Sequence, residues 1–237
     1  MAGHGSTIEY SGNGMTFEGY LSRPSASDAP VVLIAHAWAG PGEHEFAVAD
    51  RLAELGYVGF AIDVYGKGKR GTSVEENTQL MMPLLENRTE LQSRLKLALQ
   101  TARGLENVDS SRIAAIGYCF GGLCVLDLAR TGADVRGVVS FHGLFSPDPT
   151  LEGTPITAKV LALHGWDDPM ADPESVRGFA SEFTKAGVDW QLHAYGGTMH
   201  AFTNRQANDP QMGTVYNPKA DARSWKAMTN FLAEIFA

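Results

Sequence analysis

The sequence predicts an α/β protein whose mostly parallel sheet has helices on both faces and an antiparallel hairpin at its amino-terminal end. Two observations carry this prediction. Short apolar runs, such as residues 31–35, are typical of strands buried on both faces. These runs alternate along the chain with amphipathic stretches of helical period, which is the pattern of βαβ units.

The elements follow one another in a regular order. A Ser-Gly-Asn-Gly turn at residues 11–14 joins the first two strands, and Gly56 ends the first helix. The long helical region in the first half is expected to be broken near Pro83. In chain order the sequence predicts strands at 8–10, 15–21 and 31–35, a helix at 43–55, a strand at 58–64, a helical region at 74–105, a strand at 112–116, a helix at 123–129, strands at 135–141 and 160–164, a helix at 172–186, a strand at 189–195 and a helix at 221–236.

Length and composition bound the class of protein. A chain of 237 residues without repeats or linkers predicts one domain, 1–237, with no separate lid. The 19 basic and 27 acidic residues give a net charge of −8 without any basic run, which argues against nucleic-acid and membrane partners. No segment has targeting character, transmembrane length or metal-ligand spacing, so no metal is expected. The two cysteines are too close together for a disulfide framework, which favours a cytoplasmic location.

Residues 117–122, Gly-Tyr-Cys-Phe-Gly-Gly, join a predicted strand to a predicted helix. The glycines let the strand and helix approach closely, so Cys119 is expected on a strained turn at the carboxyl end of the sheet. The helix N-terminus beside the sulfur favours the thiolate, which is the nucleophilic form. The pattern is a G-x-S-x-G nucleophile elbow with cysteine in place of serine. The alternative is a buried structural cysteine in a glycine-rich turn.

Two further residues complete a catalytic set. Asp168, in the Gly-Trp-Asp-Asp-Pro segment 165–169, supplies a carboxylate that can orient a histidine, with Asp167 as the alternative. His200 follows a Gly-Gly turn at a strand end, from which its imidazole can reach the nucleophile. Among the other histidines, His164 is expected to make a local backbone hydrogen bond, and His142 and His193 are expected to be structural.

Nucleophile, acid and histidine run along the chain as Cys119, Asp168 and His200, which is the order of α/β-hydrolases. The chain resembles the dienelactone hydrolase family, the cysteine-nucleophile branch of that fold, over almost its full length. The resemblance rests on segments 117–122, Asp63-Val64-Tyr65-Gly66, His164-Gly165-Trp166-Asp167-Asp168 and His200-Ala201-Phe202. It implies an α/β-hydrolase fold, a thioester-forming hydrolase, and no metal or organic cofactor.

The resemblance also implies an oxyanion hole and a substrate class. The backbone N–H groups of Phe120 and Trp38 are expected to hold the oxyanion, Trp38 by its position in the family's loop and with Ala39 as the alternative. A thiolate, with a pKa of about 8.5, leaves a tetrahedral adduct more readily than an ordinary alkoxide. The predicted substrates are therefore small molecules, either activated carboxylic esters or (di)enol lactones.

The sequence departs from the family at the substrate pocket. Family members that cleave dienelactone carry a glutamate where this chain has Ala37; Glu43 lies nearby as a substitute, or serves the helix dipole. Of the two arginines that clamp a substrate carboxylate in the family, Arg205 is an imperfect match for one, and Arg70 or Arg88 could supply the other. The aromatic residues expected to line the pocket are Trp38, Tyr65, Phe145, Trp166 and Phe202.

Other activities are compatible with the same residues. An aryl phosphotriester is neutral and tetrahedral, so the oxyanion hole could bind its phosphoryl oxygen in a promiscuous reaction. A noncatalytic binding protein on this fold and a redox enzyme using Cys119 and Cys124 are the more distant alternatives. Either a monomer or a homodimer is expected, because the helix at 221–236 and the opening hairpin offer surfaces but no pattern that requires pairing.

Overall fold

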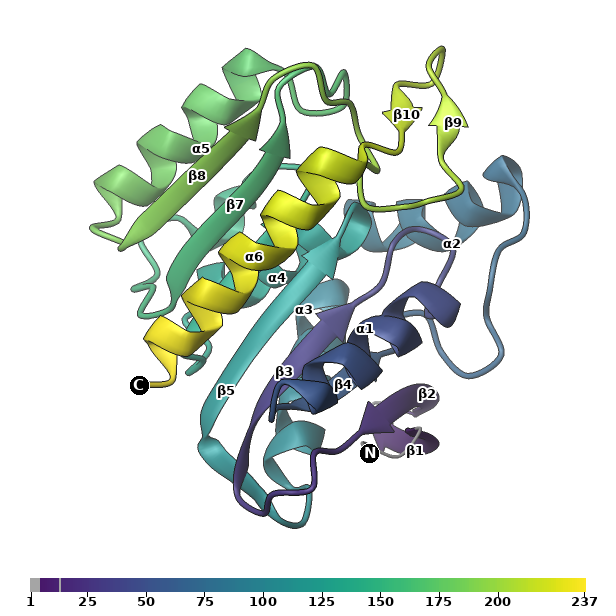
Figure 1. Ribbon diagram of the computed structural model, residues 1–237, viewed down its shortest axis with the longest axis vertical. Coiled ribbons are helices and arrows are strands. Elements are labelled where there is room, and N and C mark those ends of the chain that lie inside the picture. Colours follow the sequence, from purple (N-terminus) through teal and green to yellow (C-terminus); the bar gives the residue numbers. More distant parts are fainter. Residues whose placement is uncertain (1–4, 13) are drawn as a thin grey trace. The chain divides into compact units, whose positions relative to one another are not determined.

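The computed structural model describes residues 5–12 and 14–237 (Figure 1). Contacts within the chain divide it into two compact units, Met1–Ile116 and Gly117–Ala237. The boundary falls within strand β5, Val108–Tyr118. The prediction of a single domain stays a prediction.

The first unit opens with the predicted antiparallel hairpin. Strands β1 (Ser6–Gly12) and β2 (Met15–Ser22) pair with Tyr10 opposite Phe17, and Asn13 of their turn lies outside the described residues. Strand β4 (Val58–Ile62) pairs antiparallel with β2 and parallel with β3 (Ala29–Ala35). Every residue of β3 and β4 is buried, as their apolar sequences predict.

Three helices belong to the first unit. Helix α1 (Glu43–Glu54) packs on β4 and matches the predicted helix. The region 74–105 forms α2 (Val74–Glu86) and α3 (Arg88–Arg103). The predicted break near Pro83 is confirmed, but it comes at Asn87, four residues after the proline, and Pro83 itself lies inside α2. The Asn87 side chain accepts a hydrogen bond from the Glu90 N–H at 3.1 Å and so starts α3.

The second unit contains the parallel strands β6 (Gly137–Phe141), β7 (Lys159–Gly165) and β8 (Trp190–Tyr195), in that order. Its helices are α4 (Phe120–Arg130), α5 (Pro173–Lys185) and α6 (Pro218–Ile235), with a short 3₁₀ helix, η1, at Pro149–Leu151. A small pair, β9 (Asn208–Asp209) and β10 (Thr214–Val215), was not predicted from the sequence.

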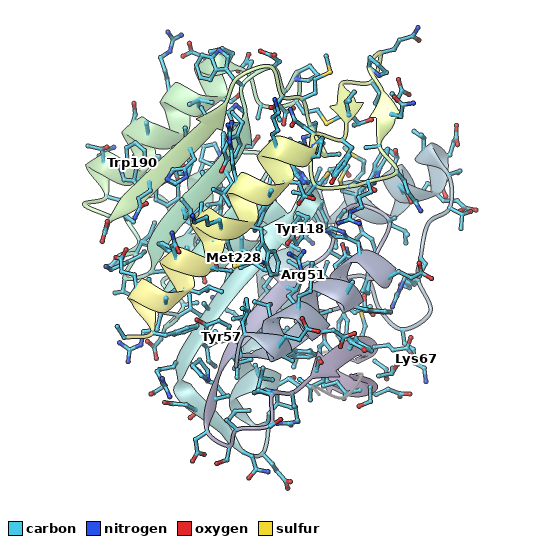
Figure 2. The ribbon with its side chains drawn as sticks, viewed as in Figure 1. Arg51, Tyr57, Lys67, Tyr118, Trp190 and Met228 are labelled. Carbon is cyan, nitrogen blue, oxygen red and sulfur yellow. The ribbon has the colours of Figure 1, made fainter. Side chains whose placement is uncertain are left out.

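Helices cover both faces of the second unit's sheet (Figure 1). Gly137 of β6 faces Phe231 of α6, whereas Ser140 faces Gly122 of α4. Residues three apart on a strand point to opposite faces, so α4 and α6 lie on opposite sides of β6. Trp190 at the start of β8, labelled in Figure 2, packs edge-on against Phe179 of α5 with ring centroids 5.6 Å apart.

The prediction of a mostly parallel α/β architecture is confirmed. In the part of the chain that the structure describes, no helix is both long enough and apolar enough to cross a membrane.

Candidate active site

Cys119 occupies the turn between β5 and α4, with φ 55° and ψ −114°. A non-glycine residue in this conformation is strained, and such strain is typical of functional positions. The turn depends on glycine, because a Cβ on Gly117 would lie 2.0 Å from the Gly121 carbonyl oxygen. The Cys119 side chain is partly exposed and makes no capping hydrogen bond to the start of α4. The predicted elbow is therefore present, and its thiol is accessible.

Asp168 and His200 form a buried hydrogen-bonded pair. Asp168 Oδ2 lies 2.7 Å from His200 Nδ1, and Asp168 Oδ1 accepts a hydrogen bond from the Met170 N–H at 2.8 Å. These contacts fix the carboxylate, and the carboxylate fixes the imidazole with Nε2 as its remaining proton-exchange atom. Asp167, the alternative acid, is exposed. The structure thus pairs the histidine with Asp168.

The loop that carries His200 is held against the loop that carries Asp168. The His200 N–H donates to the Gly213 carbonyl at 2.9 Å, and the Val215 N–H donates to the His200 carbonyl at 3.1 Å. Gly165 ends β7 close to this loop, because a Cβ there would lie 2.6 Å from the Thr198 carbonyl oxygen. The segment containing β9 and β10 thus fixes the backbone of His200. The sequence gives no strong signal for it, since two-residue strands show no periodicity.

Electrostatics favour the protonated form of His200. Burial alone would lower its pKa, but the negative charge of Cys119 and the hydrogen bond to Asp168 raise the pKa to about 10. Among the described residues, Nε2 has no hydrogen-bond partner of standard geometry. His200 thus interacts electrostatically with Cys119, and Nε2 is the ring atom not engaged by Asp168.

His164 differs from its expected role. The sequence predicts a local backbone hydrogen bond, but both ring nitrogens of this buried histidine lack a hydrogen-bond partner within the described residues 5–12 and 14–237. Its ring packs against Phe145 at 5.4 Å and Trp166 at 6.5 Å. Burial lowers the pKa of His164 and so keeps the ring neutral beside the charged His200.

Neither of the two cysteines forms a disulfide bond among the described residues. Cys124 is buried inside α4, whereas Cys119 precedes the helix and is partly exposed. Among the described residues, no group of three or more His, Cys, Asp or Glu side chains could hold a metal ion.

The predicted binding residues of the second unit differ in accessibility. Phe202 is buried between His142 and Tyr195, and Phe145 is buried against Phe179. Trp166 is 45% exposed. Arg205 is also exposed, in the loop after His200. Among these residues, therefore, Trp166 and Arg205 are the ones with accessible side chains, and their roles in binding stay predictions.

In the first unit, Trp38 lies in the loop after β3. It is half-buried, and its carbonyl accepts a hydrogen bond at 2.9 Å from the hydroxyl of Tyr65, a buried residue. Arg70 donates to the Pro41 carbonyl at 2.7 Å and so also supports this loop. The oxyanion role of the Trp38 N–H stays a prediction.

Glu45, rather than Glu43, is the carboxylate that reaches Ala37. Glu43 is exposed in the first turn of α1, which fits a helix-dipole role. Glu45 is buried and accepts hydrogen bonds from the N–H groups of Ala37 at 3.4 Å and Gly42 at 3.0 Å. Glu45 was not predicted from the sequence. Its position in the first turn of α1, two residues after Glu43, was the signal that could have indicated it.

The pH dependence of stability should report Glu45. Burial raises its pKa from 4.5 to about 7, against the opposing effect of the N–H donors and Arg70. The folded state thus keeps a proton that the unfolded state releases above pH 4.5, so stability is lost as pH rises from about 4.5 through about 7. The loss should reach roughly 2–3 kcal/mol. Thermal melts between pH 4 and 8 should show wild type losing stability relative to Glu45→Gln as the pH rises. If the stabilities of the two proteins changed in parallel with pH, Glu45 would not be the group responsible.

The fold and the site define the class of the protein. A cysteine elbow followed along the chain by an aspartate–histidine pair at the ends of parallel strands is the arrangement of an α/β-hydrolase. Residues 17–236 match the model of the dienelactone hydrolase family. The chain belongs to the dienelactone hydrolase family and is a hydrolase.

Similar proteins extend over nearly the whole chain. A relative from Aquifex aeolicus (strain VF5), named "Putative carboxymethylenebutenolidase", is 28% identical over 233 residues, covering 96% of this chain and 97% of its own. The solved structure of m3DLH is 34% identical with a TM-score of 0.93 and covers 98% of both chains. The dienelactone hydrolase-like promiscuous phosphotriesterase P91, from metagenomic libraries, is 31% identical with a TM-score of 0.95 and covers 100% of both chains.

Proposed function

We propose that this hydrolase cleaves activated carboxylic esters or enol lactones through Cys119, His200 and Asp168, with a covalent thioester intermediate. The observation that supports this most directly is the strained, partly exposed Cys119 at the start of α4, which interacts electrostatically with the buried His200 that Asp168 holds by a 2.7 Å hydrogen bond. The name of the Aquifex aeolicus relative supports a lactone among the substrates.

The proposed reaction has two stages. The Cys119 thiolate attacks the carbonyl carbon, and the C–O bond to the leaving group breaks as His200 donates its Nε2 proton to that oxygen. Neutral His200 then takes a proton from water, whose oxygen attacks the thioester carbon, and the C–S bond breaks to restore the thiolate. The Phe120 N–H, directly after the nucleophile, is one proposed oxyanion donor, and the Trp38 N–H is the other predicted one. Asp168 orients His200 throughout.

The nucleophile restricts the substrate to good leaving groups. A thiolate leaves the first tetrahedral adduct more readily than an alkoxide of high pKa, so simple alkyl esters revert to reactants. Phenolates and enolates leave readily, which commits the adduct to the thioester. Aryl esters and enol lactones are thus the proposed substrates.

A stopped-flow burst assay with p-nitrophenyl acetate tests this function. Wild type should show a burst and a mass increase of one acetyl group on Cys119, and Cys119→Ala should show neither. Cys124→Ala is the matched control, because it removes the other thiol and should keep the burst. Hydrolysis at an unchanged rate in Cys119→Ala, without an adduct in wild type, would contradict the proposal.

An aryl phosphotriesterase activity is a second candidate, favoured by the likeness to P91. The same thiolate would attack phosphorus, expel a phenolate and form a thiophosphoryl enzyme that water must hydrolyse. Diethyl p-nitrophenyl phosphate should then release p-nitrophenolate through repeated turnovers in wild type and not in Cys119→Ala. A single turnover that stops at a stable adduct would limit the chain to ester and lactone hydrolysis.

A further inference from the structure

A second buried histidine lies beside the proposed catalytic residues. His142 follows β6 with φ 38°, a left-handed conformation that is uncommon for a residue other than glycine. Its backbone N–H donates to the Leu163 carbonyl at 2.8 Å, which fixes the turn. The imidazole makes one hydrogen bond to the elbow and another to the loop after His200.

The two hydrogen bonds determine which nitrogen of His142 carries the proton. The Cys119 backbone N–H donates to His142 Nδ1 at 3.2 Å and also to the Phe141 carbonyl at 3.0 Å. A backbone N–H only donates, so Nδ1 must be unprotonated. The proton therefore sits on Nε2, which donates to Thr203 Oγ1 at 2.8 Å. His142 is a neutral imidazole with a defined tautomer.

The surroundings of the ring agree with this assignment. The ring meets His200 edge-on with centroids 5.1 Å apart, and Phe202 at 5.0 Å with a similar geometry. A positive charge on His142 would repel the protonated His200. Neutral His142 can therefore remain in contact with the His200 ring.

We infer that His142 is a positioning residue that ties the Cys119 elbow to the loop carrying His200. One end of its imidazole holds the Cys119 amide, and the other end holds Thr203, three residues after His200. The inference rests on the proposed function. This bridge of two hydrogen bonds holds the peptide that precedes the strained Cys119. It thereby fixes the direction of the Cys119 thiolate and of the Phe120 N–H that follows it. Its loss should slow acylation more than it weakens substrate binding.

Four variants separate the two ends of the bridge. His142→Asn keeps an acceptor for the Cys119 N–H and tolerates the left-handed backbone. His142→Leu removes both hydrogen bonds. Thr203→Val removes only the hydroxyl, and Thr203→Ser restores it. The acylation rate with p-nitrophenyl acetate should fall about 10- to 100-fold in His142→Leu, by less in Thr203→Val, and should recover in His142→Asn and Thr203→Ser. The substrate dissociation constant, obtained from the concentration dependence of the acylation rate, should stay nearly constant throughout.

A second measurement does not depend on turnover. Nitrogen-15 NMR of wild type should show His142 with an unprotonated Nδ1 and a protonated Nε2, and the Cys119 amide proton should shift in His142→Leu and return toward its wild-type position in His142→Asn. A protonated Nδ1, or a wild-type acylation rate in a folded His142→Leu, would overturn the inference. A wild-type enzyme that forms no adduct would overturn the proposed function instead, while the NMR spectra would still decide whether the bridge exists.

Discussion

The Asp168→Asn variant is expected to fold normally and to lose most of its activity. Asp168 Oδ2 accepts from His200 Nδ1 at 2.7 Å in a buried environment, so the carboxylate both orients the ring and stabilises its positive charge. An amide at this position has no charge, and its NH₂ group favours the wrong tautomer of the histidine. By analogy with other triads, kcat should fall on the order of a thousandfold to ten thousandfold.

The variant should also change the titration of His200. Loss of the carboxylate removes a contribution that raises the pKa of His200, so this pKa should fall below its wild-type value of about 10. NMR titration of the imidazole and kcat with p-nitrophenyl acetate measure the two effects. Asp167→Asn is the matched control, because Asp167 is exposed and adjacent in sequence. Equal activity losses in the two variants would contradict the assignment of Asp168.

The parts of the site that were predictable from the sequence are those encoded locally. The glycines around Cys119 determine a tight turn by their own sterics, and the apolar runs of the parallel strands indicate where each strand ends. Asp168 and His200 each follow such a strand end, so their pairing could be predicted from topology alone. The 2.7 Å contact between them agrees with that prediction.

The features that were missed depend on contacts between residues far apart in the sequence. His142 and Thr203 are 61 residues apart, and no local pattern distinguishes this histidine from a core residue. Pro83 shows the limit of a local rule, since the helix break lies near the proline as predicted, but α2 continues through the proline itself and ends at Glu86. Neither helical period nor strand alternation reports which side chains meet in space.

The Arg130→Met variant is expected to lose more stability than any other single change considered for this chain. Arg130 is buried at the end of α4, where its Nε and Nη2 atoms bind both oxygens of Glu182 at 2.7 and 2.8 Å. Its Nη1 atom binds buried Asp127 at 3.2 Å and donates to the Ser146 carbonyl at 3.1 Å, and its Nη2 atom also donates to the Phe145 carbonyl at 3.1 Å. Methionine fills much of the space but leaves these acceptors without their cation. Breaking a buried ion pair on one side costs about 3–5 kcal/mol.

Urea unfolding followed by circular dichroism measures this loss. The exposed pair of Arg177 and Glu174 on α5 provides the control, because Arg177→Met should change the free energy of unfolding by about 1 kcal/mol or less. The double variant Arg130→Met/Asp127→Asn then separates the causes. If the buried charge of Asp127 is responsible, neutralising it should recover a large part of the lost stability. If the double variant is as unstable as Arg130→Met alone, the lost stability arises instead from the missing hydrogen bonds to Glu182 and the two carbonyls, because Asp127→Asn does not restore them.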